Sequence, residues 1–126
     1  MTLHVRRTSL ALPDSAPDQV VISSVGEDDA ELTQTWSAPA DNGSAITSYE
    51  LRYRVTDPQG SWTDVTGISS GATSYDITGL TNEEEYDIQV RAVNAEGDGA
   101  WSATSTGTPT ASNTVPAQVV ISSVEL

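Results

Sequence analysis

The side chains that most often perform catalysis or bind transition metals are almost absent from this sequence. His4 is the sole histidine, and the chain contains neither cysteine nor lysine. We therefore expect no histidine-based triad, no histidine or thiolate metal cluster and no cysteine nucleophile. Hydroxyl side chains remain as nucleophiles, but no base is available to activate them, so the sequence predicts a protein that is not an enzyme.

Carboxylates are the other groups that could do chemistry, either as a glycosidase acid pair or as ligands for Ca²⁺. They gather in two runs within predicted turns, Glu27–Asp29 and Glu83–Glu85, which is typical of solvated surface. Asp41 and Asn42 offer further oxygen ligands. Their spacing matches no EF-hand-like loop, and turn chemistry explains this segment without a metal. We therefore expect no catalytic, metal or cofactor site.

The charge balance excludes several classes of partner. Eighteen acidic residues oppose five arginines, which gives a net charge of −13 at pH 7. Such a charge opposes binding to nucleic acid and to anionic lipid. The chain has no apolar run of about 18 residues, so membrane insertion is not expected. Solubility explains the acidic surface, and adaptation to a high-salt or marine setting is the alternative explanation.

Strand signals recur about every ten residues with turn residues between them, and no segment carries a sustained helical period. In the clearest half-buried strand, Tyr49, Leu51 and Tyr53 alternate with charged residues. The seven predicted strands are residues 20–25, 30–36, 49–54, a short one around Trp62 and Val65, 74–78, 86–93 and 101–108. Chains with this pattern pack two antiparallel sheets over one core.

Core and turn positions spread along these strands resemble the fibronectin type III family. They are Pro17, Trp36, Tyr49, Leu51, Tyr53, Leu80, Tyr86, Ile88, Val90, Ala92 and Asn94. The resemblance covers residues 16–109, and we identify it as the tandem-repeat type, similar to bacterial or viral surface proteins. It implies an all-β, seven-stranded antiparallel immunoglobulin-like sandwich. It also implies a core and a tyrosine corner at Leu80 and Tyr86, where the phenol hydroxyl bonds to upstream backbone. The implied core residues are Trp36, Tyr49, Leu51, Tyr53, Leu80, Tyr86, Ile88 and Val90.

The sequence departs from the family pattern at three places. Asn82 and Glu83 stand where the family often has Pro-Gly, and Gln34 stands where an apolar residue is usual. If Gln34 points inward, its amide must find hydrogen-bond partners. The last strand lacks bulky aliphatic residues, so we expect that edge to be loosely packed.

Trp62 and Trp101 are predicted to be partly exposed, which would suit a carbohydrate platform or a protein hot spot. The alternative is that they only cover a sheet face or a strand end. Glu96-Gly97-Asp98 lies where some members of the family carry an Arg-Gly-Asp integrin motif. The glutamate removes the cation, so we predict a tight turn there. Asn42-Gly43-Ser44 is a glycosylation sequon, meaningful only in a cell that glycosylates.

The first predicted strand is repeated at the end of the chain. Residues 17–25 read PDQVVISSV and residues 116–124 read PAQVVISSV, an offset of 99 residues with eight of nine positions identical. This predicts a leader or flanking tail over 1–15, a domain over 16–109, and a linker with the first strand of a following repeat over 110–126.

We therefore predict a non-catalytic spacer and protein- or carbohydrate-binding repeat of a larger extracellular, cell-surface or virion protein. Its expected partners are neighbouring repeats and other proteins. The alternative is a subunit of a filament in which residues 115–126 add to, or replace, a strand of a neighbouring copy. Val119, Val120 and Ile121 would then make the contact.

Overall fold

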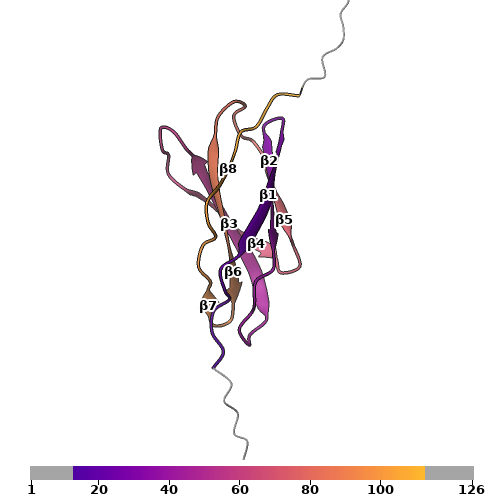
Figure 1. The fold of residues 1–126 in the computed structure, drawn as a ribbon, viewed down its shortest axis with the longest axis vertical. Helices are drawn as coiled ribbons and strands as arrows, with labels where there is room; N and C mark the ends of the chain where they lie inside the picture. Colours follow the sequence, from indigo (N-terminus) through magenta and orange to yellow (C-terminus); the bar gives the residue numbers. More distant parts are fainter. Residues whose placement is uncertain (1–12, 113–126) are drawn as a thin grey trace, which may run out of the picture.

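The computed structural model describes residues 13–112, which form two antiparallel β-sheets packed face to face (Figure 1). The strands are β1 (Val21–Asp28), β2 (Glu31–Ser37), β3 (Ile46–Val55), β4 (Thr63–Ser69), β5 (Ser74–Ile77), β6 (Tyr86–Asn94), β7 (Gly97–Asp98) and β8 (Ser105–Gly107). One sheet has the order β1-β2-β5, and the other has the order β4-β3-β6-β7 with β8 also paired to β6. The predicted all-β antiparallel sandwich is confirmed.

The strand count and the last strand differ from the prediction. Eight strands form rather than seven, because Gly97 and Asp98 pair with the end of β6 inside the predicted turn. The last strand begins at Ser105 instead of at residue 101. Before it, the Val90 N–H donates to the Ser102 hydroxyl at 3.0 Å, so a side chain occupies the place of a backbone acceptor. That substitution interrupts the ladder and shortens the strand.

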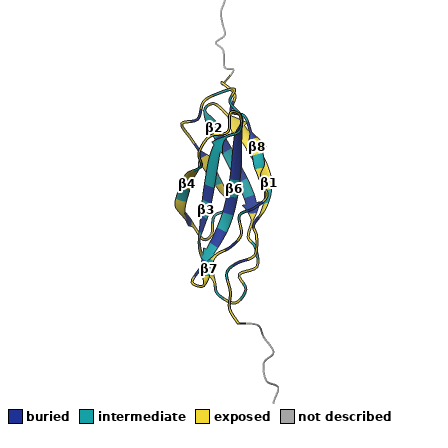
Figure 2. Ribbon diagram, turned by 90° about the vertical axis from the view of Figure 1, so that its left-hand side faces the viewer, coloured by how far each residue is buried: buried dark blue, intermediate teal, exposed yellow. Residues whose placement is uncertain are grey.

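The core lies between the two sheets, and β6 is buried along most of its length (Figure 2). Trp36 from one sheet packs against Tyr49 from the other, with ring centres 5.2 Å apart. Burial raises the pKa of the Tyr49 phenol, and a weaker interaction with Trp36 opposes this shift. The Trp36 indole N–H itself is buried without a hydrogen-bond partner of normal geometry in the described part of the chain.

The residues implied to form the core have the following positions. Trp36, Tyr49, Leu51, Leu80, Tyr86, Ile88 and Val90 are buried, and Tyr53 is half-buried. The Tyr53 ring packs edge-on against Tyr86, with ring centres 6.3 Å apart. The Tyr86 hydroxyl accepts a hydrogen bond of 3.0 Å from the N–H of Thr81, which fixes the crossover that precedes β6.

The N-terminal segment is fixed at one end of the sandwich by two asparagines. The Asn94 amide donates to the carbonyls of Ser15 at 2.8 Å and Asp41 at 3.0 Å. The Asn42 amide donates to the Ala16 carbonyl at 2.8 Å. We call this end, made of residues 14–19 and the loops 40–44 and 94–101, the N-terminal pole.

The chain leaves the sandwich at the opposite end (Figure 1). There the Thr110 N–H donates to the Asp28 carbonyl at 3.1 Å, and the Glu83 N–H donates to the Pro109 carbonyl at 2.8 Å. These bonds join the last residues of the domain to two separate turns. We call this end, made of residues 27–30, 80–85 and 108–110, the C-terminal pole.

Candidate functional site

Three of the five arginines of the chain lie together on the outer face of the larger sheet. Arg52 and Arg54 are two residues apart on β3, so they point to the same side, opposite to the buried Tyr49 and Leu51. Arg91 comes from the adjacent strand β6. The alternation of apolar and charged residues thus gathers cations on one face.

Two tryptophans intercalate between these arginines. The Trp62 ring centre lies 4.3 Å from the Arg52 guanidinium carbon and 4.0 Å from that of Arg54. The Trp101 ring centre lies 4.3 Å from both Arg52 and Arg91. Each of the two rings therefore has two guanidinium groups close to it. We call this row, Arg54, Trp62, Arg52, Trp101 and Arg91, the Trp–Arg stack.

The outer arginines of the Trp–Arg stack are paired with carboxylates, and the central one is not. Arg54 binds Asp87 at 3.1 Å, and Arg91 binds Glu50 at 2.6 Å and Asp98 at 3.1 Å. Among the described residues, Arg52 forms no ion pair. Its Nε donates to the Gln89 side-chain carbonyl at 2.8 Å.

The electrostatics of Arg52 follow from this position. Burial between the two rings lowers the pKa of the Arg52 guanidinium, and repulsion from Arg91 and Arg54 lowers it further, while Asp64 acts in the opposite direction. An arginine is a cation at neutral pH, and among the described residues this one lacks the carboxylate partner that Arg54 and Arg91 each have. It is the position in the Trp–Arg stack that a partner's acceptor group would best complement.

The positions of Trp62 and Trp101 in the Trp–Arg stack bear on their predicted role as a binding surface. Both rings are half-buried, and two guanidinium groups lie close to each of them. A sugar ring stacks on the open face of an aromatic side chain, and here guanidinium groups lie within 4.3 Å of the centres of both rings. The Trp–Arg stack thus presents indole and guanidinium groups, two of the side-chain types enriched in protein hot spots.

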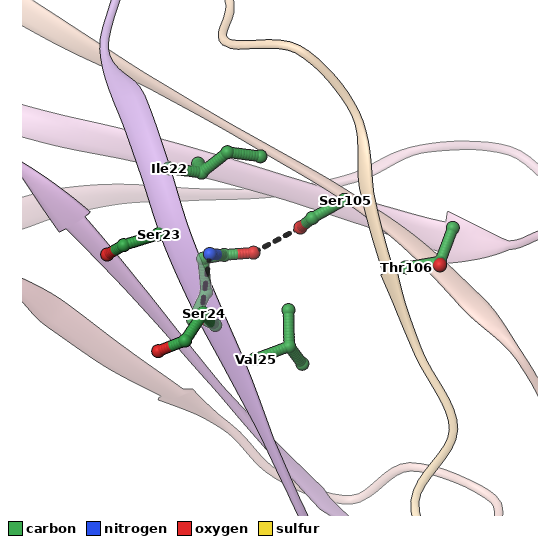
Figure 3. Close-up of a pocket in the computed structure, with 7 residues that line it drawn as sticks. Ile22, Ser23, Ser24, Val25, Ser105 and Thr106 are labelled. Atoms are coloured by element: carbon green, nitrogen blue, oxygen red, sulfur yellow. Dashed lines mark hydrogen bonds between the residues drawn. The ribbon is translucent and has the colours of Figure 1, made fainter.

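A second feature lies at the open edge between the sheets, where β1 faces β8. A cleft of about 230 Å³ is lined by Ile22, Ser23, Ser24, Val25, Gln34, Ser105 and Thr106 (Figure 3). β8 has only three residues and carries no large aliphatic side chain, which explains why this edge is incompletely filled. The cleft is open to solvent and small, and its lining is mixed.

The inward-pointing Gln34 is the polar floor of this cleft and is fully buried. Its amide donates to the carbonyls of Ser24 at 3.0 Å and Thr35 at 2.9 Å, and its carbonyl accepts from the Ser105 hydroxyl. A bulge in β1 between Ile22 and Ser24 accompanies this arrangement. The required partners of a buried amide are therefore present, and Gln34 has a structural role.

The remaining candidate residues lie apart from both features. The Glu96 N–H bonds to the Asn94 side chain at 2.8 Å, in the turn between β6 and β7. Asn42 of the sequon has its amide engaged by Ala16 and by Asp18 at 3.0 Å. Val119, Val120 and Ile121 lie outside the described residues, as do the predicted tail up to residue 12 and the segment 115–126.

Sequence reasoning missed the arginines of the Trp–Arg stack. The alternation of residues 49–54 predicts only that Arg52 and Arg54 lie on the outer, solvated side of their strand. The available signal was that two of five arginines sit two positions apart, shortly before a tryptophan, in an otherwise acidic chain. Arg91 could not have been added, because its place in the row depends on the register of β3 with β6.

Within residues 13–112, no group of three or more metal-binding side chains is found, and no helix is long and apolar enough to cross a membrane.

Comparison with known proteins identifies the family to which this architecture corresponds. The family model described as the fibronectin type III domain matches residues 15–108. Among curated proteins, sidekick-1 of Gallus gallus is 33% identical over 99 residues, which are 76% of this chain and 4% of that protein. Contactin-2 of Homo sapiens is 34% identical over 91 residues, 69% of this chain and 8% of that protein. Receptor-type tyrosine-protein phosphatase F of Homo sapiens is 34% identical over 92 residues, 73% of this chain and 4% of that protein.

Two solved structures share the fold. The FN5 domain of Drosophila Lar has a TM-score of 0.60 at 18% identity and covers 75% of this chain and 98% of that chain. A myokine structure has a TM-score of 0.59 at 17% identity and covers 77% of this chain and 99% of that chain. The chain therefore corresponds to the whole length of single-domain structures but to a small fraction of the curated proteins that it matches.

Proposed function

The chain belongs to the fibronectin type III family, and from this premise we propose that it is a non-catalytic spacer repeat of a larger extracellular, cell-surface or virion protein. In this role the domain separates other parts of its parent protein by a fixed length. It also presents one sheet face to protein partners.

The observation that carries the spacer role is the direction of the chain. The described part of the chain begins at one end of the long axis of the sandwich and ends at the other (Figure 1). The sequence of the first strand returns 99 residues later, at the place where a following domain would begin. Domains joined in this way extend end to end, because each one begins where the previous one ends.

A chain with two consecutive repeats tests this proposal. We define the two-repeat chain as residues 1–124 followed by residues 26–126, which preserves the natural junction because Val124 corresponds to Val25. Small-angle X-ray scattering should give an unchanged cross-section and a maximum dimension close to twice that of the single chain. A compact particle with the two domains side by side would contradict the spacer role.

The Trp–Arg stack supports the binding part of the proposal. It joins two tryptophans and three arginines on one face of an acidic molecule. Residues of these two types dominate protein hot spots. A binding screen against a panel of extracellular domains should identify ligands of the unchanged chain, and these ligands should not bind the Trp62→Ala variant, in which the row is broken. Ligands that bind the variant and the unchanged chain equally would contradict the assignment of this face.

One observation favours the alternative role as a strand-exchanging subunit. Within residues 13–112, β1 lies at the edge of its sheet and pairs there with β2 alone. Residues 116–124 copy the first half of that strand and could pair with or replace it in another molecule. Light scattering separates the two roles, because exchange between copies raises the molar mass with concentration and the spacer role does not.

A further inference from the structure

We propose that the C-terminal pole of this domain is the docking surface for the N-terminal pole of the repeat that follows it along the chain. The inference rests on the proposed tandem array. It adds a defined contact between consecutive repeats, whose strength depends on charge.

The first argument is the length of chain available between two repeats. Thr110 is still fixed to the domain, because its N–H donates to the turn between β1 and β2 at 3.1 Å. Ser15 is already fixed at the N-terminal pole through both its N–H and its carbonyl. By the 99-residue offset, Thr114 corresponds to Ser15. The four Cα steps from Thr110 to Thr114 reach at most about 14 Å, so the two anchoring points of the facing poles would lie within about that distance of each other.

The second argument is the charge of the surface that would be covered. The C-terminal pole carries exposed carboxylates on both of its turns. They are Glu27, Asp28, Asp29, Glu83 and Glu85. The N-terminal pole of this domain is acidic as well, with exposed Asp14, Asp18, Asp41 and Glu96. Two poles with these charges would repel each other across the short junction.

The third argument is the sequence of the next N-terminal segment. Compared with residues 14–25, residues 113–124 keep Pro and the whole run QVVISSV but replace both acids. Asp14 corresponds to Asn113, and Asp18 corresponds to Ala117. The carboxylates have thus disappeared from the segment that would face the acidic C-terminal pole, while the strand itself is unchanged. This is the pattern expected of a surface that docks there.

The inference is tested on the two-repeat chain by distances between spin labels. The chain has no cysteine, so single cysteines at the exposed Ser70 and at its counterpart in the second repeat carry the labels without background. Pulsed electron paramagnetic resonance should give one narrow distance. A matched control with 12 Gly and Ser residues inserted after Ser112 adds a flexible link of about 20 Å, and its distribution should be at least twofold broader.

The charge argument has its own variant pair. Asn113→Asp with Ala117→Asp restores both acids and should broaden the distribution at 10 mM salt. At 1 M salt the width should return to that of the unchanged chain, because the screening length falls from about 30 Å to about 3 Å. Thr63→Asp with Thr66→Asp adds the same charge at exposed residues of β4, outside both poles, and should broaden the distribution less than the acid-restored pair does.

The outcomes distinguish this inference from the proposed function. A natural junction as broad as the insertion control at both salt concentrations would overturn the contact between poles. An acid-restored variant as narrow as the unchanged chain at 10 mM salt would overturn the charge argument. A single chain that associates in light scattering would remove the spacer role instead. A two-repeat chain that is monomeric and extended but broad would leave the spacer role intact and remove only the contact.

Discussion

Replacing Arg52 with alanine tests whether the Trp–Arg stack contributes to stability. The variant loses two cation–π contacts at 4.3 Å, to Trp62 and Trp101, each worth about 0.5–1 kcal/mol at a partly exposed site. It also loses the hydrogen bonds to Gln89, which contribute about 1 kcal/mol. Relief of repulsion from Arg54 and Arg91 offsets part of the loss. We expect the free energy of unfolding to fall by about 2 kcal/mol, which corresponds to a fall in Tm of about 10 °C for a domain of this size.

Urea unfolding followed by circular dichroism measures this loss without relying on tryptophan emission. A double-mutant cycle with Trp62→Ala isolates the contact itself and should give a coupling energy of about 0.5–1 kcal/mol. Thr66→Ala, exposed on β4 and outside the Trp–Arg stack, is the control and should change stability by less than about 0.5 kcal/mol. A loss for Arg52→Ala no larger than that of the control, together with zero coupling, would refute the reasoning.

Three further substitutions test other parts of the structure. Ser105→Ala leaves the carbonyl of the buried Gln34 without its hydroxyl partner and should lower the free energy of unfolding in urea by about 1–2 kcal/mol. In a chain that already carries Gln34→Leu, the same Ser105→Ala substitution should cost less, because the buried carbonyl is gone. An equal cost of Ser105→Ala in both chains would contradict this. Burial raises the pKa of Tyr49 above the ordinary tyrosine value of 10.0, so the folded state holds the proton more tightly than the unfolded state. This contribution to the free energy of unfolding is present below pH 10.0 and is lost as the pH rises through the raised pKa. Tyr49→Phe should therefore reduce the fall of the free energy of unfolding with pH, and an unchanged fall above pH 10.0 would count against this explanation. Asn94→Ala removes the amide that holds the Ser15 carbonyl at 2.8 Å, so hydrogen exchange at the Ser15 amide should quicken at least tenfold, whereas unchanged protection would show that the N-terminal pole does not depend on Asn94.

The parts of the fold that the sequence predicted depend on local alternation. In β3, Tyr49 and Leu51 are buried while the charged residues that alternate with them are not. In β6, every second residue from Tyr86 to Ala92 is apolar and buried. A strand of this kind has one orientation that satisfies both the core and the solvent, so its burial pattern can be read before the structure is known. The position of Gln34 on the inward face of β2 followed from the same alternation.

The parts that escaped prediction depend on register and on irregular backbone. The Trp–Arg stack requires Arg52 to lie opposite Gln89 on β6 and Asp64 on β4, and sequence alone does not fix those pairings. Trp101 enters the row from a segment outside the strands, where the Ser102 N–H donates to the Val90 carbonyl at 2.8 Å but the Ser102 hydroxyl replaces the backbone acceptor. Pairing of Gly97 and Asp98 with β6 likewise needed the three-dimensional path of the turn.

The central claim is that the domain works as an independent spacer rather than as a strand-exchanging subunit. Light scattering over a hundredfold concentration range tests it most directly, on residues 1–126 and on a chain that ends at Ser112. The spacer account predicts a monomer mass for both chains at every concentration. A mass that rises with concentration for residues 1–126 alone would contradict it and would make residues 115–126 the functional element.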